Sequence, residues 1–202
     1  MIFAAEMAKE QSCYIRFFNG ACGLDDADIF VGGEVVAQNL AHGAFSEFRK
    51  AQPGAYNVEV CIGGNEVEYS ELFSFMEDMA YTIVLVGNPE HIDMAIISLD
   101  LRQDFKRPNL RFANMMPHDT VIDINIDRHK AVQGLAYKEV SYHIEIMPGN
   151  YVVTVFDDES RKILEDGITI AADHSYLAIA AGSVAEPENP PGLYIAEEMP
   201  FL

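Results

Sequence analysis

The chain has 202 residues, with 32 acidic and 13 basic side chains, which gives a formal net charge of −19 at pH 7. Half of the residues are hydrophobic, enough to form a sizeable core, which excludes a wholly disordered chain. The pI near 4.4 argues against nucleic acid or an anionic membrane as a partner, because phosphate binding needs clustered lysine and arginine. No apolar run approaches the roughly 18–20 residues that span a bilayer, so we expect no transmembrane segment.

In chain order, the first half predicts short strands separated by glycine and proline turn signals. They are expected over residues 14–19, 27–32, 44–49, 55–62, 72–76, 81–87 and 91–101. The second half predicts strands over residues 109–114, 121–127, 139–144, 151–156, 167–172 and 175–182, with a seventh in the tail near 193–196. Residues 70–78 are the segment where a short helical turn is the main alternative. About seven short strands at roughly ten-residue spacing are typical of an antiparallel sandwich.

The two halves resemble each other at a constant offset of 95 residues. Residues 15–87 placed on 110–182 without a gap give 17 identities in 73 positions, whereas unrelated sequences of ordinary composition would give about four or five. The shared positions that carry turn or polar signals are Arg16, Asn19, Asp28, Pro53, Gly54 and Tyr56, matched by Arg111, Asn114, Asp123, Pro148, Gly149 and Tyr151. Because one register holds throughout, we interpret the chain as a tandem duplication. The predicted fold class is all-β, with two tandem antiparallel β-sandwich domains of immunoglobulin-like or transthyretin-like type.

The predicted domains are residues 1–101 and 109–202, joined by a linker over 102–108. So short a linker leaves little reach, and we expect the two units to touch. Several positions are larger and more apolar in one copy than in the other: Phe45 and Phe48 stand against Val140 and His143, and Met115 and Met116 against Gly20 and Ala21. Burial against the other unit or a partner would explain them, and so would ordinary drift after duplication.

The repeated Pro-Gly-x-Tyr element predicts a type II turn, with glycine at positive φ, followed by a strand whose tyrosine ring enters the core. For the repeated arginines and asparagines two interpretations stand. One is a small polar ligand at the end of the first strand. The favoured one is structural: the asparagines bond turn backbone, and Arg16 and Arg111 pair with Asp28 and Asp123.

The search for reactive or metal-binding constellations returns little. The known nucleophile-elbow, zinc-protease, phosphate-loop, dinucleotide and EF-hand patterns do not occur. The histidines at 42, 91, 118, 129, 143 and 174 are dispersed. Cys13, Cys22 and Cys61 favour free thiols, although one bridge involving Cys22 stays possible for an exported protein. Asp25, Asp26 and Asp28 offer oxygen ligands to Ca²⁺, but the second copy lacks the cluster, which favours solvated loop acids. We therefore assign no catalytic, cofactor-binding or metal-ligating residue and expect no cofactor.

The ordered series R-F-x-N, D-I-x-V, N-L-A, P-G-x-Y-x-V-x-V and Y-x-I-V-x-V-G resembles the domain of unknown function 4397 family, a bacterial β-sandwich domain often found in tandem. The resemblance covers residues 14–100 and 109–182. The family's R-x-x-H-A-S-P-D-A-P-like segment is replaced here: the histidine position holds Asn19 and Asn114. Similar proteins are mostly secreted or surface-associated, so the resemblance implies a surface or envelope module without an assigned activity.

Three function classes remain open. A non-catalytic structural or adhesion-type surface module is favoured, with an unknown protein or glycan as its partner. A glycan- or peptide-binding module is the alternative: the absence of tryptophan weakens a sugar platform, although Tyr14, Tyr69, Tyr137 and Tyr142 offer rings for stacking. An enzyme of unknown class is third. We expect no signal peptide in residues 1–10, because a basic start and a longer apolar core are missing, so a cytoplasmic location is the alternative to the envelope.

Overall fold

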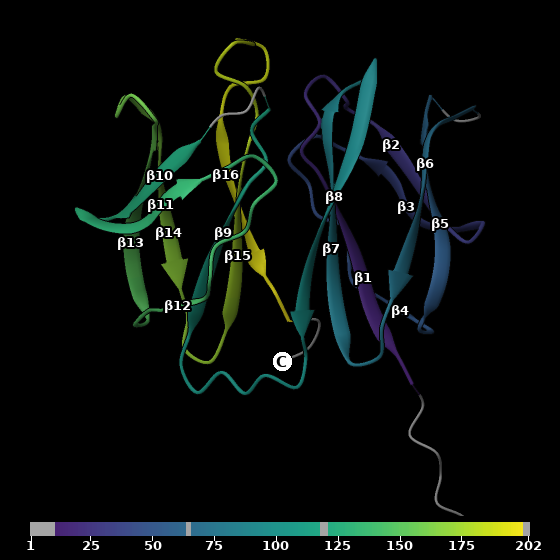
Figure 1. Cartoon of the computed structure of the whole chain (residues 1–202), viewed down its shortest axis with the longest axis horizontal. Coiled ribbons are helices and arrows are strands. Elements are labelled where there is room, and N and C mark those ends of the chain that lie inside the picture. Colours follow the sequence, from purple (N-terminus) through teal and green to yellow (C-terminus); the bar gives the residue numbers. More distant parts are fainter. Residues whose placement is uncertain (1–10, 64–65, 118–120, 200–202) are drawn as a thin grey trace, which may run out of the picture.

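The computed structural model describes residues 11–63, 66–117 and 121–199, and they form β-strands, turns and loops (Figure 1). The first repeat contains β1 (Cys13–Asn19), β2 (Ala27–Val31), β3 (Glu34–Leu40), β4 (Arg49–Ala51), β5 (Gly54–Ile62), β6 (Glu66–Phe75), β7 (Met79–Asn88) and β8 (His91–Asp100). The second repeat contains β9 (Asn109–Asn114), β10 (Ile122–Ile126), β11 (His129–Leu135), β12 (Ile144–Glu145), β13 (Gly149–Asp157), β14 (Lys162–Ile170), β15 (Ser175–Ala181) and β16 (Gly192–Glu197). The predicted all-β class is confirmed. Our interpretations of residues 1–10 and of His118 fall outside the described residues.

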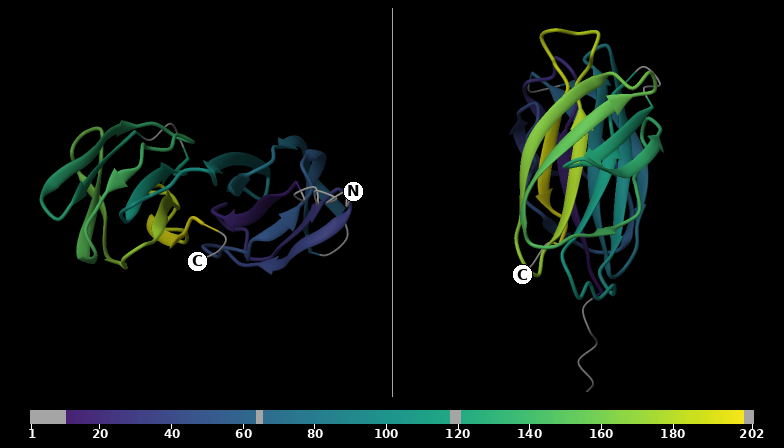
Figure 2. Two further views of the ribbon diagram at one scale, coloured as in Figure 1. Left: turned by 90° about the horizontal axis from the view of Figure 1, so that it is seen from below. Right: turned by 90° about the vertical axis from the view of Figure 1, so that its left-hand side faces the viewer.

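Each repeat is a sandwich of two four-stranded sheets. We call β4-β1-β7-β8 and β12-β9-β15-β16 the inner sheets, and β3-β2-β5-β6 and β11-β10-β13-β14 the outer sheets. The inner sheets of the two repeats face each other, and the outer sheets lie on the far sides (Figure 2). Pairing is antiparallel except between β1 and β7 and between β9 and β15, which run parallel.

Each repeat has eight strands where seven were expected, and the additional ones are β3 and β11. Both are edge strands of outer sheets, and a bulge breaks the alternation that reveals a strand in sequence. The bulge contains Asn39 in one repeat and Gly134 in the other, both at positive φ. The repeated aspartates hold it: Asp28 Oδ1 accepts a hydrogen bond from the Asn39 N–H at 2.8 Å, and Asp123 does the same for Gly134.

The strand expected over residues 72–76 is found within β6, and the helical turn considered as the alternative for residues 70–78 does not form. One further expectation about local structure was wrong. The strands expected over 44–49 and 139–144 are reduced to the isolated bridges of Phe45 and Val140, and the regular pairing begins later, at β4 and β12. Short β4 and β12 leave the inner sheets without a long edge strand on that side.

The Pro-Gly-x-Tyr element works differently from the predicted type II turn. Gly54 and Gly149 are the first residues of β5 and β13, and Gly149 has no positive φ. A Cβ at Gly54 would lie 3.2 Å from the ring of Tyr56, so the glycine makes room for the tyrosine two residues later. The Tyr56 hydroxyl donates to the Gln52 carbonyl at 3.1 Å, and the Tyr151 hydroxyl makes the matching bond in the second repeat.

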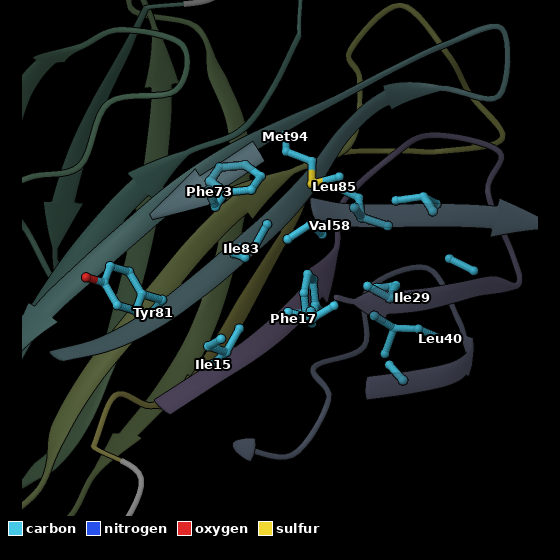
Figure 3. Packing of buried hydrophobic residues seen from close by; sticks show 14 of the residues in the cluster. Ile15, Phe17, Ile29, Leu40, Val58, Phe73, Tyr81, Ile83, Leu85 and Met94 are labelled. Atoms are coloured by element: carbon cyan, nitrogen blue, oxygen red, sulfur yellow. The ribbon is translucent and has the colours of Figure 1, made fainter. Parts of the chain in front are cut away.

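Apolar cores lie between the inner and outer sheets of each repeat (Figure 3). In the first repeat, Phe17 of β1 meets Ile29 and Val58 of the outer sheet. Tyr56 and Tyr151, whose rings were expected to enter the core, are only half-buried. Equivalent apolar residues of the two repeats are buried in the cores: Phe17, Ile29, Leu40, Val58 and Val60, and Phe112, Ile124, Leu135, Val153 and Val155. Tyr56 faces Phe73 and Tyr151 faces Ile168, again 95 residues apart, as the duplication predicts.

Candidate functional site at the contact between the repeats

The described residues contain a third apolar cluster, which belongs to neither sandwich core. It lies where the two inner sheets meet, and each repeat supplies half of its buried members. They are Phe18, Val84, Val86, Ala95 and Ile97 from the first repeat and Ala113, Met115, Leu177, Ile179 and Ala181 from the second. On β1, Phe17 enters the sandwich core and the next residue, Phe18, enters this contact, because successive side chains of a strand point to opposite faces. The expectation that the two units touch is met.

Aromatic side chains close one end of the contact. Tyr194 of β16 lies with its ring centroid 5.2 Å from that of Phe18, whose ring also packs on Phe45 at 4.5 Å. Gly43 has φ +75°, and a Cβ there would lie 2.5 Å from the Tyr194 ring, so this approach requires glycine.

The four residues that are larger and more apolar in one copy now have separate explanations. Phe45 and Met115 pack in the contact between the repeats. Met116 belongs instead to the second repeat's own core. Phe48 stacks on Arg16, with 4.4 Å between the ring centroid and the guanidinium carbon.

Arg16 projects from β1 into the contact and is 4% exposed. Its Nε donates to the Thr82 hydroxyl at 2.9 Å, and its Nη1 donates across the contact to the Glu197 carbonyl at 2.7 Å. Its guanidinium lies over the rings of Phe45 and Phe48. Burial lowers the pKa of Arg16 to about 10, against the attraction of Glu198.

Arg111, the equivalent residue of β9, is also buried but has different partners. It forms an ion pair with Glu198, which is 2% exposed. His143 Nε2 lies 3.2 Å from the other oxygen of that carboxylate, and the Ser175 hydroxyl lies 3.5 Å from the same oxygen. Arg111 Nη2 donates to the Ser98 carbonyl of the first repeat at 2.9 Å.

The two arginines therefore reach across the contact in equivalent directions. Ser98 of β8 pairs with Tyr81 of β7, and Glu197 of β16 pairs with Tyr176 of β15. The two accepting carbonyls therefore occupy matching places in the repeats. Each arginine bonds the last strand of the opposite repeat. The predicted pairing of Arg16 and Arg111 with Asp28 and Asp123 was wrong, because the arginines point away from the outer sheets to which those aspartates belong.

Polar contacts at the rim complete the interface. Lys138 of the second repeat forms an ion pair with Asp93 of β8, and the Gly23 N–H donates to Asn189 Oδ1 at 3.0 Å. Partial burial raises the pKa of Asp93, but hydrogen bonds from Lys138 and from the Met94 N–H outweigh it, so that the pKa lies below its ordinary value.

Asn19 and Asn114 have the structural role that the sequence analysis favoured. Asn19 Nδ2 donates to the carbonyls of Leu24 and Leu40, and its Oδ1 accepts from the Ala21 N–H. Asn114 repeats the bonds to Leu135 and Met116. Both side chains are fully buried and their atoms are used by turn backbone.

The other candidate groups do not converge. Within the described residues, no three histidine, cysteine or acidic side chains gather closely enough to hold a metal ion. Asp25 and Asp26 are exposed, and Asp28 is engaged at the β3 bulge. The three cysteines are free and buried. No helix among residues 11–63, 66–117 and 121–199 is long and apolar enough to cross a membrane.

Each sandwich has an open cleft at the side where its two sheets part. In the second repeat, a cleft of about 490 Å³ lies between β11 and the segment leading to β12, lined among others by Gln133, Glu139 and Tyr142. Tyr142 is 94% exposed. In the first repeat, a cleft of about 420 Å³ lies between β3 and β4, lined among others by Val35 and Arg49.

Comparison with known proteins identifies the family. The model described as "Domain of unknown function (DUF4397)" matches residues 13–105 and again 108–198. The chain belongs to the DUF4397 family. The two matches coincide with the two structural repeats, so the duplication is one of whole DUF4397 domains.

No curated protein matches this DUF4397 chain. Among solved structures, the N-terminal domain of AlgF from P. aeruginosa is similar to 45% of this chain and 96% of that domain, with 23% sequence identity and a TM-score of 0.32.

Sequence reasoning missed the partners of the two arginines. Glu197 and Glu198 lie in the tail, where the loop before β16 is longer than its counterpart before β8 and the 95-residue offset no longer applies. The available signal was the run Leu193–Tyr194–Ile195, which marks a last strand. Aligning that strand with β8 would have matched Glu198 to Leu99 of the first repeat and so marked it as a residue of the inner sheet.

Proposed function

We propose that this DUF4397 chain is a non-catalytic structural or adhesion-type module of the cell surface or envelope, in which two domains act as one rigid body. The contact between the inner sheets supports this most strongly. Ten buried apolar residues and two buried arginines are used to join the domains. The outer sheets and the loops at the sandwich ends are then the surfaces offered to a partner.

The domain boundary belongs to this proposal. We infer that the first domain ends at residue 101, that residues 102–108 connect the two, and that the second domain begins at residue 109. Asp100 and Arg102 form an ion pair with two side-chain hydrogen bonds at the start of this connection. A short, locally held connection suits two domains that do not separate.

Location and role are tested together in cells that carry the natural protein. Fractionation with surface proteolysis is expected to find it in the envelope and open to external protease. Loss of the protein is expected to weaken attachment of the cells to surfaces or to one another. Recovery of all the protein from the cytosol, protected from external protease, would contradict the proposal.

The second candidate is a peptide-binding module, and the cleft beside β11 favours it. β11 is an edge strand, so its outward backbone groups are available to an extended peptide, and the exposed Tyr142 ring stands at the cleft. A peptide and glycan array screened with the whole chain tests this. A peptide ligand should lose binding to Tyr142→Ala but keep it with Met147→Ala, which changes another exposed large side chain outside the cleft lining. Equal loss in both variants, or glycan ligands alone, would contradict it.

A further inference from the structure

The pseudo-symmetric docking of the repeats creates an electrostatic problem at its centre. Equivalent positions of the two inner sheets carry Arg16 and Arg111, and docking brings both guanidinium groups into one buried region, where each raises the cost of burying the other. Arg16 Nη2 has no hydrogen-bond partner among the described residues. Two buried cations at a sheet contact require a counter-charge.

Glu198 supplies that charge from one repeat only. Ala80 pairs with Leu99 in the first repeat. The counterpart of Ala80 is Ser175, whose backbone carbonyl accepts a hydrogen bond from the Glu198 N–H. Glu198 therefore occupies the place that Leu99 has in the first repeat. Both are buried, at 2% exposure for Glu198 and 3% for Leu99. The carboxylate binds Arg111 directly and attracts Arg16 across the contact.

The partners of the carboxylate differ between the repeats as a set. In the second repeat, Glu198 is flanked by His143 and Ser175. In the first repeat, the corresponding positions hold Leu99, Phe48 and Ala80. All three positions are polar in the second repeat and apolar in the first. This is the pattern of one network built in one copy, since unrelated drift would change the three positions independently.

We propose that the two inner sheets dock only when no more than one of their two buried arginines lacks a carboxylate, and that Glu198, by pairing with Arg111, is the residue that lets the first repeat accept the second. A second copy of the first repeat would bring another arginine and Leu99 in place of a carboxylate. The inner sheet of the first repeat therefore docks with the second repeat and not with another copy of the first. This inference is independent of what the outer surfaces bind.

The test uses the whole chain and moves the carboxylate between equivalent positions. Glu198→Leu leaves two arginines without a counter-charge, and the double variant Leu99→Glu/Glu198→Leu restores one beside Arg16. Glu197→Gln is the matched control, because it removes the neighbouring negative charge from an exposed side chain that pairs with His174, while the Glu197 carbonyl still accepts from Arg16. Small-angle scattering reports whether the repeats are docked, and circular dichroism reports whether the sandwiches are folded.

We expect Glu198→Leu to remain β-folded and to give an enlarged envelope of separated repeats. The double variant and Glu197→Gln should keep the compact envelope. Should Glu198→Leu fail to fold, Arg111→Leu/Glu198→Leu takes its place. This variant is expected to dock, because Arg16 is then the one buried arginine of the pair that remains. A compact Glu198→Leu protein would overturn the proposal. Separated repeats in either double variant would also overturn it.

Discussion

Phe18→Ala measures how much the contact between the repeats contributes to stability. Phe18 is fully buried and packs on Phe45 and Tyr194. Removing its ring forfeits about 2–3 kcal/mol of transfer free energy and two aromatic contacts of about 0.5–1.5 kcal/mol each. With partial collapse of the cavity, the free energy of unfolding should fall by about 3–5 kcal/mol. For a chain of this size, that corresponds to a melting temperature lower by roughly 6–20 °C.

Phe17→Ala is the control, because Phe17 is the neighbouring residue of the same strand and is equally buried, but in the first repeat's own core. Urea and thermal unfolding are measured for both variants, with scattering on the folded proteins. Both should lose stability to a similar extent, and only Phe18→Ala should also populate separated repeats. If Phe18→Ala shifts the unfolding free energy by less than about 1 kcal/mol, the contact is not the stabilising interface described above.

Three further predictions concern the rim, the cores and the repeated asparagines. Because the pKa of Asp93 is lowered in the folded protein, the stability from its pair with Lys138 is present above the ordinary carboxyl pKa of about 3.9 and is lost as the pH falls through the folded value. Asp93→Asn should therefore flatten the stability profile below about pH 4, and an unchanged profile in urea titrations would contradict the pairing. Val58→Ala and Val153→Ala should each cost about 1–3 kcal/mol in urea unfolding, and unchanged midpoints in both would refute their burial. Asn19→Ala removes the side-chain donor from the buried carbonyls of Leu24 and Leu40 and should cost about 1–3 kcal/mol; a thermal midpoint equal to that of the natural protein would argue against this role.

The parts of the fold that repeat in sequence could be predicted, because a residue kept in both copies has a role within each sandwich. Asn19 and Tyr56 act on backbone a few residues or one strand away, so their counterparts Asn114 and Tyr151 follow at the same offset. β3 was missed because its bulge at Asn39 and its exposed edge position remove the alternation that identifies a strand.

The contact between the repeats could be anticipated but not assembled from sequence. The short linker indicated that the units touch, yet Arg16 bonds a carbonyl 181 positions away. The repeat itself suggested a local partner such as Asp28, since both copies keep that aspartate. What decided the matter is the orientation of alternate residues on β1, together with the longer final hairpin that sets Glu197 and Glu198 in place.

The central claim, that two DUF4397 domains form one rigid body through their inner sheets, is tested most directly by a distance between the outer sheets. Spin labels are placed at Leu72→Cys on β6 and Val152→Cys on β13, two exposed positions on the far sides of the molecule, after replacement of the three natural cysteines by alanine. Pulsed electron–electron double resonance should give a single narrow distance distribution that matches the structure and does not change with salt. A broad distribution, or one that widens with ionic strength, would contradict the claim.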